Sequence, residues 1–126
     1  MSYNYDLKTC TVLIEENYVV NQVKEGVHVE IEQIKLVHEL IEKHLGNNPY
    51  IYISDRKFSY SVNPLVYNFI STIKNMEVVI TVIDNKTKLA FAQFENQFYN
   101  KTIMIFEHLE DATSWVKNYF KNMKRS

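Results

Sequence analysis

Residues 50–64 carry the side chains with the clearest chemical potential in this chain. They read Tyr-Ile-Tyr-Ile-Ser-Asp-Arg-Lys-Phe-Ser-Tyr-Ser-Val-Asn-Pro, so an apolar run leads into charges and hydroxyls. Polar loops that follow buried strands are where α/β proteins usually bind their ligands. We therefore select the following residues as candidates for contact with a ligand or a partner: Asp55, Arg56, Phe58, Ser59, Tyr60, Ser61 and Asn63.

The end of this stretch predicts a helix start. Asn63 is a favourable N-cap, and the fixed φ of Pro64 suits the first helical position. The free N–H groups of that helix would face the loop that carries Ser59 and Ser61, where an anion or a phosphorylated hydroxyl fits. Ser61 is therefore a candidate phosphorylation site. The alternative is that both serines only satisfy backbone groups of a turn.

The remaining reactive side chains form no recognisable motif. The four histidines, which are His28, His38, His44 and His108, have none of the spacings typical of metal ligands. No glycine-rich turn follows a strand, which disfavours a nucleotide site. The single cysteine, Cys10, lies in an alternating pattern typical of a strand, where a cysteine is usually a small buried apolar residue. We predict no metal, no cofactor and no enzymatic activity, because no nucleophile, base and orienting group occur together.

Hydrophobic periodicity predicts the elements that position this loop. Residues 5–14 and 18–23 alternate as two strands of an antiparallel hairpin, and residues 31–45 follow as a helix that Gly46 ends in the left-handed conformation. Further strands are expected at 50–54, 78–83 and 102–106, and further helices at 64–74, 88–99 and from 112 onward. The order ββαβαβαβα predicts an α/β fold: one domain over residues 1–126, with its core at about 5–120, four helices and a mixed sheet of about five strands.

Apolar stripes on the later helices suggest which faces are buried. Leu65, Phe69 and Ile73 should point inward from the second helix, and Phe91, Phe94 and Phe98 should join the core from the third. If the three phenylalanines were exposed instead, they would mark an association surface. On the last helix, the stripe comprises Ala112, Trp115, Val116, Tyr119 and Phe120.

Composition narrows the classes of partner. Fourteen basic and fifteen acidic residues give a net charge of −1, which argues against a nucleic-acid surface. The N-terminus does not resemble a secretory leader, and no window approaches the roughly 18 apolar residues of a membrane span. With a single cysteine and no disulfide, the chain is expected to be cytoplasmic.

Four features of the sequence point to a known family. They are the hairpin followed by βα units, the loop Ile-Ser-Asp-Arg-Lys-Phe-Ser-Tyr-Ser-Val-Asn-Pro, the strand Val-Val-Ile-Thr-Val-Ile and the closing Ile-Phe-Glu-His-Leu-Glu-Asp-Ala-Thr-Ser-Trp-Val. Together they resemble the SpoIIAA-like branch of the STAS family. The best-known STAS proteins are antagonists of anti-sigma factors, in which a partner kinase phosphorylates a serine at the start of a helix. Ser61 is the nearest match, although the chain reads Tyr-Ser-Val-Asn-Pro where that family has Asp-Ser-Ser-Gly.

This resemblance implies a non-catalytic regulatory or protein-interaction module. It would dock an unidentified regulatory partner through the loop 55–63 and the helix that follows, and a homodimer remains open. The alternative is a small domain that binds an apolar ligand or lipid in a cavity between sheet and helices.

Overall fold

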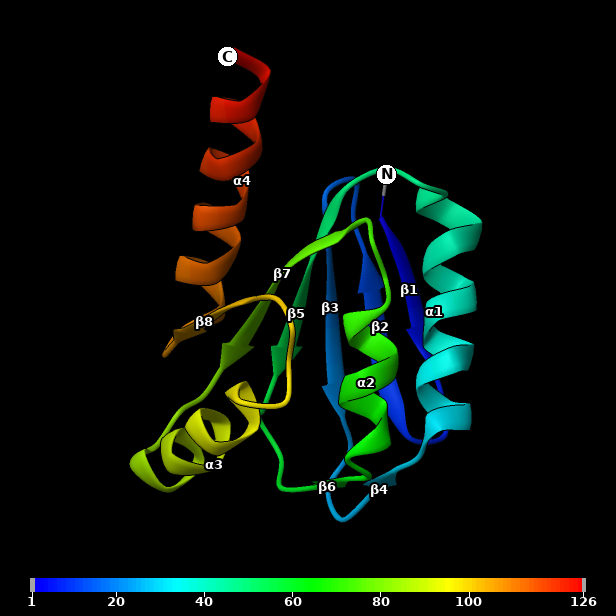
Figure 1. Ribbon diagram of the computed structural model, residues 1–126, viewed down its shortest axis with the longest axis vertical. Coiled ribbons are helices and arrows are strands. Elements are labelled where there is room, and N and C mark those ends of the chain that lie inside the picture. Colours follow the sequence, from blue (N-terminus) through cyan, green and yellow to red (C-terminus); the bar gives the residue numbers. More distant parts are fainter. Residues whose placement is uncertain (1, 126) are drawn as a thin grey trace.

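The main sheet of the protein has six strands in the order β1-β2-β3-β5-β7-β8. The structure is a computed structural model that describes residues 2–125, apart from the side chains of residues 86, 87, 124 and 125. β1, β2 and β3 pair antiparallel in that order, whereas β3, β5, β7 and β8 run parallel to one another (Figure 1). The strands are β1 (Tyr3–Asp6), β2 (Cys10–Ile14), β3 (Tyr18–Val23), β5 (Tyr50–Asp55), β7 (Met76–Val82) and β8 (Thr102–Phe106). A separate two-residue parallel pair joins β4 (His28–Val29) to β6 (Ser61–Val62).

The two faces of the sheet are covered by different helices. One core group joins the sheet to α1 (Ile31–Leu45) and α2 (Leu65–Ser71), and a second joins the opposite face to α4 (Leu109–Arg125). Side chains alternate between these groups along each strand, as the two-residue period of a strand requires. Tyr50 and Tyr52 of β5 face α1 and α2, for example, whereas Ile51 and Ile53 face α4.

The remaining helix, α3 (Lys86–Asn96), lies apart from both layers. Figure 1 shows it beyond the arrowheads of β5 and β7, at the end of the sheet where the parallel strands finish. Among its described side chains, those of Ala92 and Glu95 are buried, and neither core group includes a residue of this helix. Its position therefore depends on contacts other than the main hydrophobic core.

The α/β class, the four helices and the mixed sheet with an antiparallel N-terminal part are confirmed, but the expected number of strands was too low. Residues 5–14 do not form one strand, because the chain turns after Asp6 and the N–H of Leu7 bonds the carbonyl of Cys10 at 2.8 Å. The turn contains no Gly, Pro or Asn. Since the alternation of apolar residues continues across it, periodicity alone merged two strands.

The inward faces expected for two helices were partly wrong. Phe91, Phe94 and Phe98 are exposed, and so is Leu65, whose exposed fraction is 53%. On α2 the buried residues are Val66, Tyr67 and Ile70 instead. An apolar stripe indicates a preferred face, but it does not show whether a sheet lies beneath that face.

α2 starts one residue later than predicted, with Pro64 at its N-cap position, but Asn63 still supplies a capping side chain. The side-chain Oδ1 of Asn63 accepts a hydrogen bond from the N–H of Leu65 at 3.0 Å. Pro64 already has helical torsion angles, with φ −55° and ψ −24°. Gly46 ends α1 with a positive φ of 57°, but its ψ of −126° differs from the left-handed helical conformation expected.

Candidate functional site

The candidate site lies where the loop 56–60 leaves the carboxyl edge of the parallel strands. β5 and β7 end in register, with Asp55 opposite Val82, and the N–H of Arg56 donates to the carbonyl of Val82 at 2.9 Å. The loop then crosses to the β3–β4 connection, where the N–H of Gly26 donates to the carbonyl of Ser59 at 2.8 Å. The short β4–β6 pair holds its far end. Because both ends are anchored in sheet, the loop has a defined course.

Arg56 is the central residue of the site, since its charged side chain is buried. It forms an ion pair with Glu95 of α3, which is also buried. The guanidinium carbon lies 4.6 Å from the ring centroid of Tyr60 and 5.1 Å from that of Phe91. Aromatic ring faces attract a cation, and the attraction grows when water is excluded. The loop and α3 are thus joined by a buried charge pair between two rings.

This ion pair is incomplete. One guanidinium nitrogen, Nη2, contacts one carboxylate oxygen, Oε1, while Nε of Arg56 and Oε2 of Glu95 are buried and have no hydrogen-bond partner in the described structure. Burial raises the pKa of Glu95, and the neighbouring guanidinium opposes this shift. Buried polar atoms are satisfied in most proteins, so two unpaired ones in a single ion pair require an explanation.

Lys88 makes a second connection between α3 and the loop. Its Nζ donates to the carbonyl oxygens of Arg56 and Lys57, both at 2.9 Å, and forms an ion pair with Asp84 at 3.0 Å. These three acceptors use the three donors of an ammonium group. Lys88 therefore holds the loop, and its hydrogen-bonding capacity is already filled.

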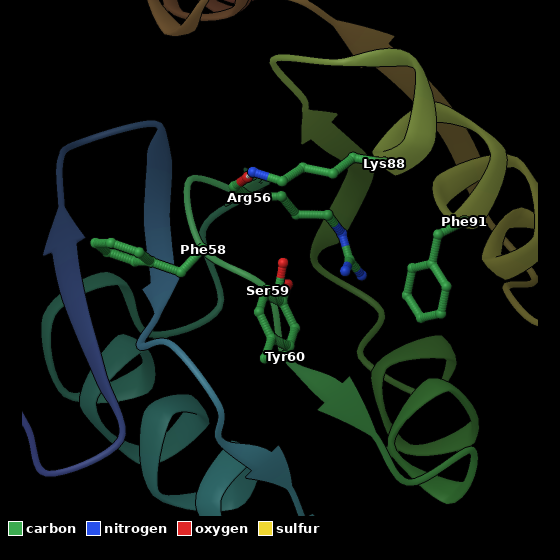
Figure 2. A pocket seen from close by; sticks show the side chains of 6 residues that line it. All are labelled: Arg56, Phe58, Ser59, Tyr60, Lys88 and Phe91. Atoms are coloured by element: carbon green, nitrogen blue, oxygen red, sulfur yellow. Dashed lines mark hydrogen bonds between the residues drawn. The ribbon is translucent and has the colours of Figure 1, made fainter.

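A pocket of about 210 Å³ opens between the loop and α3. Figure 2 shows the guanidinium of Arg56 between the rings of Tyr60 and Phe91, with the Ser59 hydroxyl directed toward the same space. The hydroxyl of Tyr60 is hydrogen-bonded to Ser54 Oγ at 3.1 Å, and desolvation raises its pKa. The lining residues are Arg56, Phe58, Ser59, Tyr60, Lys88 and Phe91.

The structure brings together four of the seven residues selected from the sequence: Arg56, Phe58, Ser59 and Tyr60. Asp55 is directed elsewhere, and its Oδ2 accepts a hydrogen bond from Gln22 at 3.1 Å. Asn63 caps α2 and also donates to Glu30 at 3.1 Å. These two residues therefore have structural contacts, and neither lines the pocket.

Ser61, the candidate phosphorylation site, also lies outside the pocket, on the exposed side of β6. Its Oγ is 2.6 Å from Nδ1 of His28, and Nε2 of the same imidazole is 2.9 Å from Oε1 of Glu30. The hydroxyl is accessible, and it is part of a hydrogen-bonded chain that reaches the start of α1. Modification at Ser61 stays a prediction.

Sequence reasoning missed the contribution of α3, which supplies Lys88, Phe91 and Glu95. Their spacing of three and then four residues places them on one face of a helix, and this signal was present. It was read as part of an apolar core stripe. Nothing in the sequence connects Arg56 with Glu95, because the two lie 39 positions apart.

Within residues 2–125, no group of three or more His, Cys, Asp or Glu side chains is arranged to hold a metal ion. In the same part of the chain, no helix has both the length and the apolarity needed to cross a membrane.

Comparison with solved structures identifies the fold. The chain is similar to a crystal structure from Shewanella loihica PV-4, described as an uncharacterized protein from the DUF3478 family with a SpoIIAA-like fold. The TM-score is 0.59, the sequence identity is 11%, and the match covers 92% of each chain. This chain has a SpoIIAA-like fold. The resemblance drawn from the sequence is confirmed at the level of that fold, whereas no family model and no curated protein matches the sequence.

Proposed function

We propose that this SpoIIAA-like domain is a non-catalytic interaction module that docks a regulatory protein partner. The docking surface comprises the loop 55–63 and the neighbouring exposed faces of α2 and α3. The observation that carries the proposal is the exposure of Phe91 and Phe94 on α3, which belongs to neither core group, and of Phe98 in the turn that follows this helix. Clustered exposed aromatic residues are typical of interaction sites.

The aromatic rings of this surface contact one another between α2, α3 and the turn that follows α3. The ring of Phe98 stacks on that of Tyr67, with centroids 5.5 Å apart, and Phe94 contacts Phe98 edge-on at 5.3 Å. Leu65 is a further exposed apolar residue on α2, the helix that carries Tyr67. Rigid aromatic side chains lose little conformational entropy when a partner covers them, so they give favourable contact area for binding.

The alternative, an apolar ligand between sheet and helices, receives less support. Two spaces between the sheet, α1 and α2 measure about 30 and 10 Å³, which is room for a water molecule rather than a lipid, and the larger of these two also reaches Arg56 and Glu95. The larger space at Arg56 lies beside the loop and α3 instead.

Site-specific photocrosslinking in the native cell tests the proposal. A benzophenone amino acid replaces Phe94, and the matched control carries it at Lys117, an exposed position on α4. We expect a protein adduct of discrete mass from position 94 only, and we expect it to be lost when Leu65 and Phe91 are both changed to Ser. The same adducts from both positions, or none from position 94, would contradict the proposal. An adduct between two copies of this chain would show that the surface forms a homodimer, and it would contradict the docking of a different regulatory protein.

A further inference from the structure

We infer that the pocket beside Arg56 binds a small aromatic carboxylate, with its ring beside Tyr60 and Phe91 and its carboxylate on the Arg56 guanidinium. The inference goes beyond partner docking, because it concerns a small ligand and is tested on the purified chain alone. Failure of the crosslinking experiment leaves it standing, and its own failure leaves the docking proposal standing.

The size of the pocket limits the ligand to a single ring with a short substituent. A volume of about 210 Å³ is below the roughly 300–1,000 Å³ typical of sites for drug-sized molecules. Tyr60 and Phe91 present aromatic rings to this space, and stacked or edge-on contacts between rings are favourable.

The charge available to such a ligand comes from Arg56. The ammonium of Lys88 is saturated by two carbonyls and Asp84, so it has no donor left for a ligand. Arg56 lines the pocket and keeps 7% of its surface exposed. A guanidinium binds a carboxylate best through two parallel hydrogen bonds, whereas its contact with Glu95 uses one nitrogen and one oxygen. A ligand carboxylate on the exposed part of the guanidinium would give this cation a second charged partner beside Glu95.

Glu95 should weaken the binding of a ligand carboxylate to Arg56. Its carboxylate already contacts the guanidinium, and a second carboxylate on the same group would experience like-charge repulsion in a poorly solvated environment. Burial also makes the charged form of Glu95 less favourable, which is visible in its raised pKa. Glu95 therefore acts as an internal competitor on α3, and neutralising it should strengthen binding.

Titration of the ¹⁵N-labelled full chain with benzoate, followed by amide chemical shifts, tests the inference. Benzyl alcohol serves as a probe with the ring but no charge, and acetate as a probe with the charge but no ring. We expect saturable shifts at residues 56–60 and 88–91 for benzoate, with affinity at least tenfold higher than for either control probe. An ionic hydrogen bond accounts for about such a factor. Absence of saturable shifts, or equal affinity for benzyl alcohol, would overturn the inference.

Four variants locate the ligand. Glu95→Gln keeps the shape of the side chain and should bind benzoate at least threefold more tightly. Arg56→Lys keeps the charge but loses the planar fork, so it should bind at least tenfold more weakly. Phe91→Ala removes one wall and should also weaken binding, whereas the control Phe98→Ala, in the turn after α3 and outside the pocket lining, should leave it unchanged.

Thermal melts first establish which variants are folded. If Arg56→Lys does not fold, the comparison of Phe91→Ala with Phe98→Ala still decides the location, and Glu95→Gln still decides the role of charge. Equal effects of the two phenylalanine substitutions, or weaker binding by a folded Glu95→Gln protein, would refute the assignment.

Discussion

Two tyrosines on β5 should respond in opposite ways to the same substitution. Tyr50 and Tyr52 lie two positions apart, face the same helices, and are both buried. The hydroxyl of Tyr50 has no hydrogen-bond partner in the described structure, whereas that of Tyr52 accepts a bond from Asn21 Nδ2 at 2.6 Å. Replacement by Phe removes only the hydroxyl, so the ring packing is retained in each case.

The magnitudes follow from the cost of an unsatisfied buried polar group, which is about 1–3 kcal/mol. Tyr50→Phe removes such a group and should raise the free energy of unfolding by about 1 kcal/mol. Tyr52→Phe leaves the buried amide of Asn21, whose Oδ1 already has no partner, without its donor bond. We expect it to lower the free energy of unfolding by about 1–3 kcal/mol.

Urea unfolding monitored by the fluorescence of Trp115, the single tryptophan, measures both changes. The m-value should be the same in all three proteins, because the surface exposed on unfolding hardly changes. Melting temperatures should move in opposite directions, by about 3–6 °C per kcal/mol for a chain of this size. If Tyr50→Phe destabilised the protein as much as Tyr52→Phe, the Tyr50 hydroxyl would have a partner and the reasoning would be refuted.

Three further results are expected. Burial raises the pKa of both core tyrosines, Tyr50 and Tyr52, above the ordinary value of 10. The stability that their neutral forms provide is therefore fully present below pH 10, and it is lost as the pH rises beyond that value. Alkaline titration of the unfolding free energy should show this loss, with a shallower slope for Tyr50→Phe. Phe120→Ala should cost about 3–5 kcal/mol in a urea melt, because the ring is buried against the sheet, whereas Lys117→Ala on the exposed side of α4 should stay within about 0.5 kcal/mol. Ser61→Asp should also stay within about 0.5 kcal/mol, since the side chain is exposed, and a drop of many degrees in its melting temperature would end the phosphorylation hypothesis.

Local signals in the sequence were sufficient for the order and type of most elements. Periods of two and of three to four residues separate strands from helices because they reflect backbone geometry, which each segment carries with it. The sequence signal for the start of α2 was also local, since the Asn63 side chain accepts a hydrogen bond from a backbone N–H only two residues away. The position of the polar loop after β5 followed from the same reading, and four of its residues do line one pocket.

Contacts between distant segments were decided only by the tertiary structure. The partner of Arg56 is Glu95, 39 positions later, and no periodicity encodes which face of one element meets which residue of another. The exposure of Phe91, Phe94 and Phe98 has the same origin, because an apolar stripe looks alike whether it covers a sheet or faces solvent. In this protein α3 lies beyond the end of the sheet (Figure 1), so the sheet does not cover Phe91 and Phe94, and a buried ion pair holds the helix there instead.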